Sequence, residues 1–196
     1  MKKPPHCTII GLVGNHASGK STLADWLANQ LRLTRPDLEL LRLNFADALR
    51  EELAEILPFK PDKTKRHPYE RQALVYVGES WREYEPRRYV RKYLERLSAR
   101  RSRLYPTVVI TDDVYHFNER EVCDLVVYIR NMNYTPPEGY TPVSVGETLA
   151  MLDQAEEDSD ALFYAIWEPQ ELEAYRHHLR GRILHALERN VPMRYA

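Results

Sequence analysis

The sequence predicts an α/β domain, a parallel sheet of about five strands with helices on both faces. Three observations carry this prediction. Short runs rich in β-branched and other apolar residues recur along all 196 residues. Most of these runs are continuously apolar, which is typical of strands that are covered on both faces. A segment whose apolar residues recur at helical spacing follows each run, and this alternation indicates parallel strands joined by crossover helices.

The apolar runs are the expected strands. Their lengths are typical of buried strands rather than of helices, and polar or turn-forming residues flank them. In chain order they are Cys7–Val13, Leu38–Leu43, Thr107–Thr111, Leu125–Ile129 and Ala161–Ile166.

Helices are expected between and after these strands. In one of them Leu49, Leu53 and Ile56 form an apolar stripe, and Pro58 ends the helix. The expected helices are Lys20–Leu33, Phe45–Leu57, Tyr69–Glu79, Pro86–Arg101, Glu119–Val122, Gly146–Glu157 and Pro169–Arg189. Polar or proline-containing loops are expected at Lys60–Pro68 and Asn131–Pro142.

The chain length suits one compact domain that spans residues 1–196. Within it we expect a helical insertion at about 58–104 and a lid-like loop at about 131–146. Such a domain is compatible with a homodimer.

The composition excludes several classes of protein. The formal net charge of -1 gives no global basic field for nucleic acid. No apolar run approaches the length of a transmembrane helix, and no signal-peptide core follows the basic segment Met1–Pro5. Cys7 and Cys123 both lie in apolar runs, which favours buried free thiols over a disulfide. We therefore expect a cytoplasmic protein with no membrane partner.

A glycine-rich motif follows the first strand and opens the first helix. It fits G-x-x-x-x-G-K-[ST], in which loop amides and the positive end of the helix dipole bind phosphate. Its context, between a strand and a helix, predicts the three-layer sandwich of a P-loop NTPase, with a chance glycine turn as the alternative. Lys20 is expected to reach the β- and γ-phosphates of ATP, and Ser21 is expected to ligate Mg²⁺. The expected cofactor-binding residues are Gly14, Asn15, His16, Ala17, Ser18, Gly19, Lys20, Ser21 and Thr22.

Two acidic residues, Asp112 and Asp113, directly follow the expected strand Thr107–Thr111. A P-loop enzyme needs an acidic group at the end of a second core strand to organise the Mg²⁺ shell. Both are therefore candidate metal ligands beside Ser21. The alternative is that one of them caps a helix or turn while the other faces the metal.

Asp47 follows the second expected strand and lies at the same carboxyl edge of the sheet as the phosphate-binding loop. Ligands of open α/β sheets bind at this edge. A carboxylate there can orient or accept the proton of an acceptor hydroxyl. The residues support equally an Asp that stabilises the first turn of a helix.

Four segments together suggest a family. They are the phosphate-binding loop, the segment Phe45-Ala46-Asp47-Ala48-Leu49-Arg50, the segment Arg71–Arg82 with Leu74 and Gly78 between its arginines, and the segment Thr111-Asp112-Asp113-Val114-Tyr115-His116-Phe117-Asn118-Glu119. In these segments and their order the chain resembles the phage deoxynucleoside monophosphate kinases, a branch of the P-loop nucleoside monophosphate kinase fold. That family has Phe-Ala-Asp-Pro-Leu-Lys in the second segment and Asp-Val-Arg-Phe-Pro-Asn-Glu in the fourth.

The resemblance implies an ATP- and Mg²⁺-dependent kinase that transfers the γ-phosphate to a deoxynucleoside monophosphate, in the host cytoplasm if the source is a phage. It implies catalytic roles for Lys20, Asp47 and Arg71. It also implies that Phe45, Asp47, Arg71 and Arg82 contact the acceptor. Asp113 aligns with the Asp of the family's Asp-Val pair, which favours Asp113 over Asp112 as the metal ligand.

The chain departs from the family at three places. Tyr115 stands where the family has Arg, Phe117 stands where it has Pro, and Trp167 begins the segment where the family usually has an Asn near the adenine. In addition, the expected lid residues Asn133–Pro142 contain no Arg, whereas family lids often supply arginines to the transferring phosphate.

Two other functions are left open by the residues. A P-loop kinase that phosphorylates a hydroxymethylated base in phage DNA would use Arg88, Lys92 and Arg96, which share one helical face, as a clamp for the nucleic-acid backbone. The plain interpretation of that face is a solvated one. The alternative of another class is a nucleotide-binding regulatory protein without transfer activity, which Tyr115 and the lid without arginine would suit.

Overall fold

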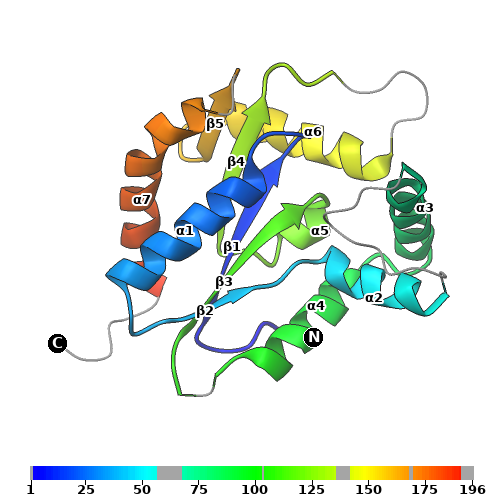
Figure 1. Cartoon of the computed structure of the whole chain (residues 1–196), viewed down its shortest axis with the longest axis horizontal. Helices are drawn as coiled ribbons and strands as arrows, with labels where there is room; N and C mark the ends of the chain where they lie inside the picture. The colour runs from blue at the N-terminus through cyan, green and yellow to red at the C-terminus, as the bar shows by residue number, and fades with distance from the viewer. Residues whose placement is uncertain (1, 57–67, 103, 136–141, 168–169, 191–196) are drawn as a thin grey trace.

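The computed structural model describes residues 2–56, 68–102, 104–135, 142–167 and 170–190. Within them, five strands form one sheet in the order β2-β3-β1-β4-β5. Every neighbouring pair of strands is parallel, which confirms the predicted α/β class (Figure 1). The strands are β1 (Cys7–Gly14), β2 (Glu39–Arg42), β3 (Thr107–Val114), β4 (Leu125–Asn131) and β5 (Leu162–Ile166).

The burial of the strands follows their place in the sheet. Every residue of β1 and β3 is buried, because helices cover both faces at the centre of a parallel sheet. The edge strand β2 is only half-buried along its length. The glycine-rich loop therefore starts from a fully buried strand, β1, which is paired with a second fully buried strand, β3.

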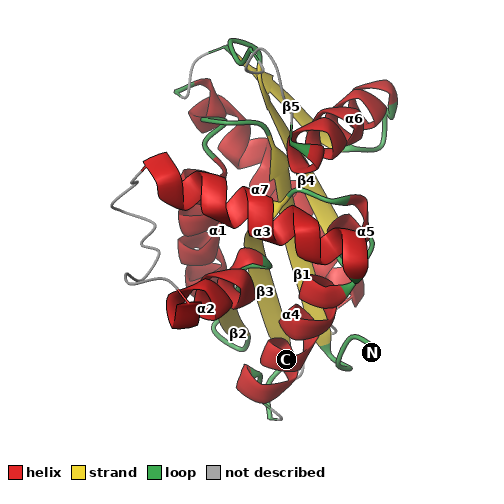
Figure 2. Cartoon of the chain, turned by 90° about the vertical axis from the view of Figure 1, so that its right-hand side faces the viewer, coloured by secondary structure: helices red, strands yellow, loops and turns green. Residues whose placement is uncertain are grey.

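Helices cover both faces of the sheet (Figure 2). They are α1 (Lys20–Thr34), α2 (Ala46–Ile56), α3 (Pro68–Tyr84), α4 (Arg88–Arg100), α5 (Phe117–Arg120), α6 (Val143–Glu157) and α7 (Glu171–Asn190). On one face α1 and α7 bury Leu27 and Ile183 against Ile10 and Ile110 of the sheet. On the other face α4 and α6 bury Tyr93 and Leu152 together with Ile9, Val109 and Tyr128. Alternate residues of β1 and β3 thus supply two separate cores.

A third cluster joins the helices beside β2. Ala48, Leu49 and Leu53 of α2 pack with Tyr89 of α4, and Leu74 and Val77 of α3 complete the contact. Gly78 allows α3 to approach closely, because a Cβ atom at this position would lie 3.0 Å from a methyl carbon of Leu49. The predicted helical insertion is thus packed onto α2 in the part that the structure describes.

Several boundaries differ from the prediction. β3 continues through Asp112 and Asp113 to Val114. Gly11 pairs with Thr111 and Val13 pairs with Val114, so β3 carries one extra residue and bulges at the two aspartates. The sequence does not reveal this extension, because the added residues Asp112 and Asp113 are polar. In the fold both are buried and their carboxylates contact neighbouring elements.

The lid-like loop expected at 131–146 is shorter than expected. Asn131 is the last residue of β4, and α6 already begins at Val143. Residues 136–141 lie outside the described part of the chain. The loop expected at Lys60–Pro68 also lies outside it, except for Pro68, where α3 begins.

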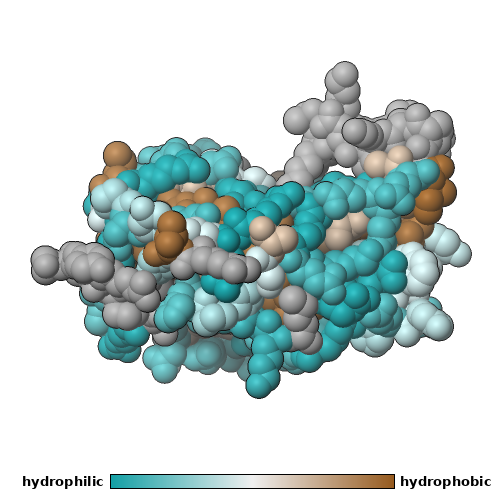
Figure 3. Space-filling view, turned by 90° about the horizontal axis from the view of Figure 1, so that it is seen from below, coloured by the Kyte–Doolittle hydropathy of each residue, from teal (hydrophilic) through white to brown (hydrophobic). Residues whose placement is uncertain are grey.

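The surface seen from below is mostly hydrophilic, with hydrophobic residues in separate patches (Figure 3). Among the described helices, none is both long and apolar enough to span a membrane. Both cysteines are free thiols, as predicted, with Cys7 buried and Cys123 half-buried. Cys123 lies against Gly11 of β1, where a Cβ atom would lie 2.5 Å from its Sγ.

Candidate nucleotide-binding site

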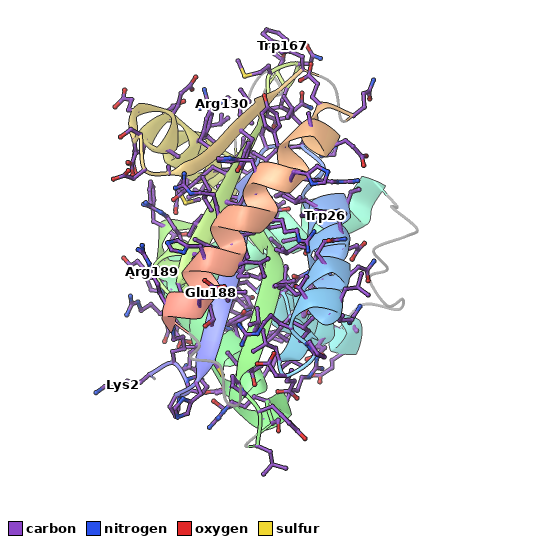
Figure 4. The ribbon with its side chains drawn as sticks, turned by 90° about the vertical axis from the view of Figure 1, so that its left-hand side faces the viewer. Lys2, Trp26, Arg130, Trp167, Glu188 and Arg189 are labelled. Carbon is purple, nitrogen blue, oxygen red and sulfur yellow. The ribbon has the colours of Figure 1, made fainter. Side chains whose placement is uncertain are left out.

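The glycine-rich loop leaves the carboxyl end of β1 and enters α1 (Figure 1). The carboxyl ends of β3, β4 and β5 lie at the same edge of the sheet because all strands are parallel. Figure 4 shows the two ends of the molecule, with Trp167 at this edge and Lys2 at the opposite one. The predicted loop residues therefore lie where open α/β sheets bind their ligands.

The loop has the backbone that a phosphate cradle needs. Ala17 and Gly19 have φ angles of 57° and 78°, so the chain turns through the left-handed region twice and its amides converge. A Cβ atom at Gly14 would lie 2.5 Å from both the Ile129 carbonyl oxygen and the Ser18 hydroxyl. Only glycine fits at Gly14, and the loop curls directly over the end of β4.

Lys20 folds back into this loop. Its ammonium group donates hydrogen bonds to the carbonyl oxygens of Gly14 at 2.6 Å and Asn15 at 2.9 Å. The same group lies 5.7 Å from the centre of the Tyr115 ring, within range of a cation–π interaction. Lys20 is thus held at the mouth of the loop, where neutral oxygens accept its hydrogen bonds.

The amino end of α1 lies at the end of the glycine-rich loop. Gly19 occupies the N-cap position of α1, and in the described part of the chain no side chain caps it. Ser21 and Thr22 in the first turn are exposed. The first amides of an uncapped helix carry a partial positive charge and bind anions. This end of α1 therefore suits phosphate.

Two asparagines tie the loop to β4. The Asn15 side chain donates to the Asn131 carbonyl at 2.9 Å and accepts from the Asn131 amide at 2.7 Å. The Asn131 side chain in turn donates to the His16 carbonyl at 3.2 Å. Spacing alone does not predict this pairing, because the motif places no restriction on the residue at Asn15.

An aromatic group lies beside the loop at the ends of β4 and β5. The rings of His16 and Tyr134 are tilted, with centroids 6.4 Å apart. Asn133 donates to the carbonyl oxygen of Trp167, which is largely exposed. The structure thus places Trp167, one of the departures from the family pattern, next to the segment that follows β4.

Asp113 caps α2. Its two carboxylate oxygens accept from the amides of Phe45 at 2.9 Å and Ala46 at 2.8 Å, and the Thr111 hydroxyl donates to it at 2.9 Å. The group is fully buried, and this burial together with the negative charge of Glu119 raises the pKa of Asp113 to about 6, against the opposing effect of the two amides. These bonds agree with the alternative in which one of the two aspartates caps a helix. They make Asp113 the less available of the two for a metal ion, and the metal role of either stays a prediction.

The raised pKa predicts a pH dependence of stability. The folded state binds the Asp113 proton more tightly than the unfolded state, whose value is near 3.8. The stabilisation that this proton contributes is complete below about pH 4 and is lost as the pH rises through 6. Relative to Asp113→Asn, the wild type should therefore lose on the order of 3 kcal/mol more unfolding free energy between pH 4 and pH 7. Urea unfolding at a series of pH values measures this difference, and parallel curves for the two proteins would contradict it.

Asp112 has different surroundings. Its carboxylate lies 3.2 Å from the guanidinium of Arg42, and only 7% of its side chain is exposed. The same guanidinium pairs with Asp25 of α1 at 2.8 Å. Asp25 follows Ser21 by one helical turn, so the two lie on one face of α1. Arg42 thus brings Asp112 to the side of the sheet where Ser21 opens α1.

Ser21 and Asp112 are oxygen donors of the kind that Mg²⁺ prefers. The hydroxyl is exposed and the carboxylate sits at the end of a neighbouring core strand. These donor types therefore fit the metal shell of a P-loop enzyme, and the choice between Asp112 and Asp113 stays a prediction.

Asp47 lies in the first turn of α2, as its alternative interpretation expects. It accepts from the Asn44 amide at 3.1 Å and pairs with Arg50 at 3.0 Å. The side chain is half-buried, so a role toward an acceptor stays a prediction. The structure corrects the expectation that Phe45 contacts the substrate, since Phe45 is 1% exposed and stacks on Tyr93 in the core.

Arg82 forms an ion pair with Glu119, whose side chain is 1% exposed, at 2.8 Å. The other oxygen of Glu119 accepts from the amides of Tyr115 and His116 at 2.9 and 3.2 Å. The guanidinium also lies 4.8 Å from the centre of the Tyr89 ring. An acceptor phosphate would have to compete with Glu119 for Arg82. Arg71 lies in α3, but its side chain is outside the described part of the structure, and its role stays a prediction.

The basic face of α4 is neither solvated nor a clamp. Arg88 and Lys92 both pair with Glu52 of α2, and Arg96 pairs with Glu51 at 2.7 Å. The acidic partners Glu51 and Glu52 lie on α2 and offset much of the positive charge of this face. The expectation of an electrostatic clamp on this face is corrected.

Several contacts at the site were not predicted from the sequence. Arg42 and the Asn15–Asn131 pair depend on contacts between distant segments. Tyr115 is recognised in the sequence only as a departure from the family, yet it lies beside Lys20. Glu119 can be singled out in the sequence by its place in the fourth family-like segment. The sequence does not show that its partner is Arg82.

No protein-family model matches this chain, and no curated protein matches it. Solved structures with a similar fold include a cysteine-to-alanine mutant of the APS kinase CysC from Mycobacterium tuberculosis, at 15% identity and a TM-score of 0.44 over 94% of this chain and 99% of that chain. The structure of APE1195 is similar at 15% identity and a TM-score of 0.43, over 94% of this chain and 98% of that chain. Likeness at this level is too distant to transfer an activity or a substrate.

Proposed function

We propose that this protein is an ATP- and Mg²⁺-dependent phosphotransferase. The observation that carries the proposal is the amino end of α1, where an uncapped helix, a doubly turned loop and the Lys20 ammonium converge. Ser21 at the start of α1 and Asp112 near the end of β3 would supply donors for the metal. Such a site suits a nucleoside triphosphate better than an isolated anion, because it offers a cation for the phosphates and oxygen donors for a metal ion.

The chain's own groups would act mainly by position and charge. The loop amides and Lys20 hold the β- and γ-phosphates, and Lys20 leaves the carbonyl oxygens of Gly14 and Asn15 to do so. Bound Mg²⁺ neutralises phosphate charge and fixes the geometry of the phosphate chain. Ser21 and Asp112 would hold it. The exposed side chains of His16 and Trp167 would flank the base.

The acceptor is proposed to be a deoxynucleoside monophosphate. The support is the resemblance of the segments that contain Asp47, Arg71 and Arg82, together with the half-buried position of Asp47 at the start of α2. Asp47 would orient the acceptor, and the arginines would bind its phosphate bidentately. The paired state of Arg82 implies that it is released from Glu119 when an acceptor binds.

DNA as an acceptor has lost its main support. The cations of α4 that would have tracked a nucleic-acid backbone are paired with Glu51 and Glu52. We favour a transferase over a purely regulatory protein, because Lys20, Ser21 and Asp112 are the residue types that phosphoryl transfer needs.

Labelled ATP separates these functions. The protein is incubated with γ-labelled ATP and Mg²⁺ and with each deoxynucleoside monophosphate in turn. Duplex DNA that contains hydroxymethylated bases is offered in a separate reaction. Label in one or more mononucleotides supports the proposal, and label in DNA moves the acceptor but keeps the chemistry. Nucleotide binding without transfer to any acceptor would contradict the proposal in favour of a regulatory protein.

Substitution of the two aspartates tests the metal role. Asp112→Asn should lower the Mg²⁺-dependent kcat/KM about a hundredfold, because a charged metal donor is lost. Asp113→Asn should act mainly on stability, since Asp113 serves α2. Steady-state kinetics over a range of Mg²⁺ concentrations, beside melting temperatures, measures both effects. A larger kinetic loss in the Asp113 variant than in the Asp112 variant would reverse the assignment.

A further inference from the structure

Arg42, on the edge strand β2, bridges two carboxylates from different elements. One of its terminal nitrogens lies 2.8 Å from Asp25 of α1, and the other lies 3.2 Å from Asp112 of β3. The two partners differ in exposure, since the side chain of Asp25 is 75% exposed and that of Asp112 is 7% exposed. The shorter contact is thus made to the solvated partner and the longer one to the buried partner.

The position of Asp112 is held by its backbone as well. Its amide donates to the side-chain oxygen of Asn44 at 3.3 Å, and Asn44 itself is buried. A buried carboxylate without a countercharge is strongly unfavourable, so Arg42 makes the ionised form of Asp112 tolerable when no metal is bound.

We propose that Arg42 is a countercation that competes with Mg²⁺ for Asp112, and that Asp25 sets the strength of this competition. The inference rests on the proposed function, because it concerns the metal of the same site. When the divalent ion binds, Arg42 gives up the longer contact to Asp112 and keeps the shorter one to Asp25. In the metal-bound protein the guanidinium of Arg42 is therefore paired with the exposed Asp25.

The charges predict opposite effects for the two partners of the bridge. Without the guanidinium, Asp112 attracts a divalent ion more strongly, because a nearby positive charge has been removed. Without Asp25, Arg42 loses its shorter ion pair and keeps, among the described residues, the one to Asp112, so it competes more strongly. Arg42 therefore acts as a positioning residue that tunes metal affinity and does not itself contact the reacting phosphate.

The test measures the coupling between metal and nucleotide rather than turnover. The dissociation constant of ADP is determined by calorimetry in EDTA and in excess Mg²⁺. The value in EDTA divided by the value in Mg²⁺ measures the coupling between metal and nucleotide. Arg42→Gln should raise this ratio about five- to tenfold, and Asp25→Asn should lower it by a similar factor. Arg42→Lys, which keeps the charge, should stay near the wild-type ratio. Arg96→Gln is the matched control, because Arg96 makes a similar ion pair away from the site, and it should leave the ratio unchanged.

A double variant decides whether Asp25 acts through Arg42. In the Arg42→Gln background, Asp25→Asn should have little further effect on the ratio. A purely structural bridge would lower the melting temperature in Arg42→Gln and Arg42→Lys alike and leave the ratio unmoved, which would overturn the inference alone. Asp25→Asn changes an exposed side chain and therefore keeps the test valid if Arg42→Gln folds poorly. Failure of the wild type to bind ADP under either condition would overturn the proposed function and the inference with it.

Discussion

Lys20→Ala should reduce phosphoryl transfer about a thousandfold, the largest kinetic effect that we expect from a single substitution. The ammonium group of Lys20 donates to two carbonyl oxygens and to the Ser18 hydroxyl at the mouth of the loop, and in the proposed function it moves from there to phosphate oxygens. An alanine leaves the negative charge that develops on these oxygens without a partner. Steady-state rates with ATP, Mg²⁺ and the labelled acceptor measure the loss.

The fold should survive Lys20→Ala, because the bonds that it removes are made to backbone oxygens at a half-buried site. Lys3→Ala is the matched control. Lys3 pairs with Asp124 near the start of β4, at the opposite edge of the sheet, and its loss should leave the rate within twofold of wild type. A Lys20 variant with full activity and an unchanged melting temperature would remove the basis of the proposed function.

Glu119→Ala should cause the largest loss of stability, about 3–5 kcal/mol. The buried carboxylate of Glu119 serves the Arg82 guanidinium and the amides of Tyr115 and His116 at once. Its removal leaves a largely buried cation and two backbone donors without their acceptor. Urea unfolding at pH 7 measures the difference in unfolding free energy.

Glu121→Ala is the control for this prediction because it lies on the same short segment. Glu121 pairs with Arg87, and both side chains are largely exposed. Exposed ion pairs of this kind contribute less than about 1 kcal/mol, so the control should change stability little. Similar losses for Glu119→Ala and Glu121→Ala would mean that the buried network contributes no more than a surface pair.

The parts of the site that depend on consecutive residues are predictable from the sequence. The proposed phosphate-binding loop between Gly14 and Ser21 would act through its own backbone. Its neighbours are a strand and a helix whose apolar spacing is visible in the sequence. The order of strands and helices is predictable for the same reason, because each element carries its own period. Asp47 at the start of α2 follows from its place after a strand.

Contacts between distant segments are not predictable in this way. Asp113 and the Ala46 amide that it caps are 67 residues apart in the chain, and spacing within either segment contains no sign of the bond. Lys92 and Arg96 have the spacing of a basic surface, and only the packing of α4 on α2 brings Glu51 and Glu52 to them. The bridge from Arg42 to Asp112 likewise depends on the neighbouring places of β2 and β3 in the sheet.

The pairing of Asn15 with Asn131 has a thermodynamic and a mechanical consequence. The hydrogen bonds between them order the phosphate-binding backbone before any nucleotide arrives. The conformational entropy of the loop is therefore lost at folding and is not lost again at binding. The same bonds couple the end of β4 to the loop, so we expect a substitution that loosens this strand end to weaken nucleotide affinity without touching the nucleotide.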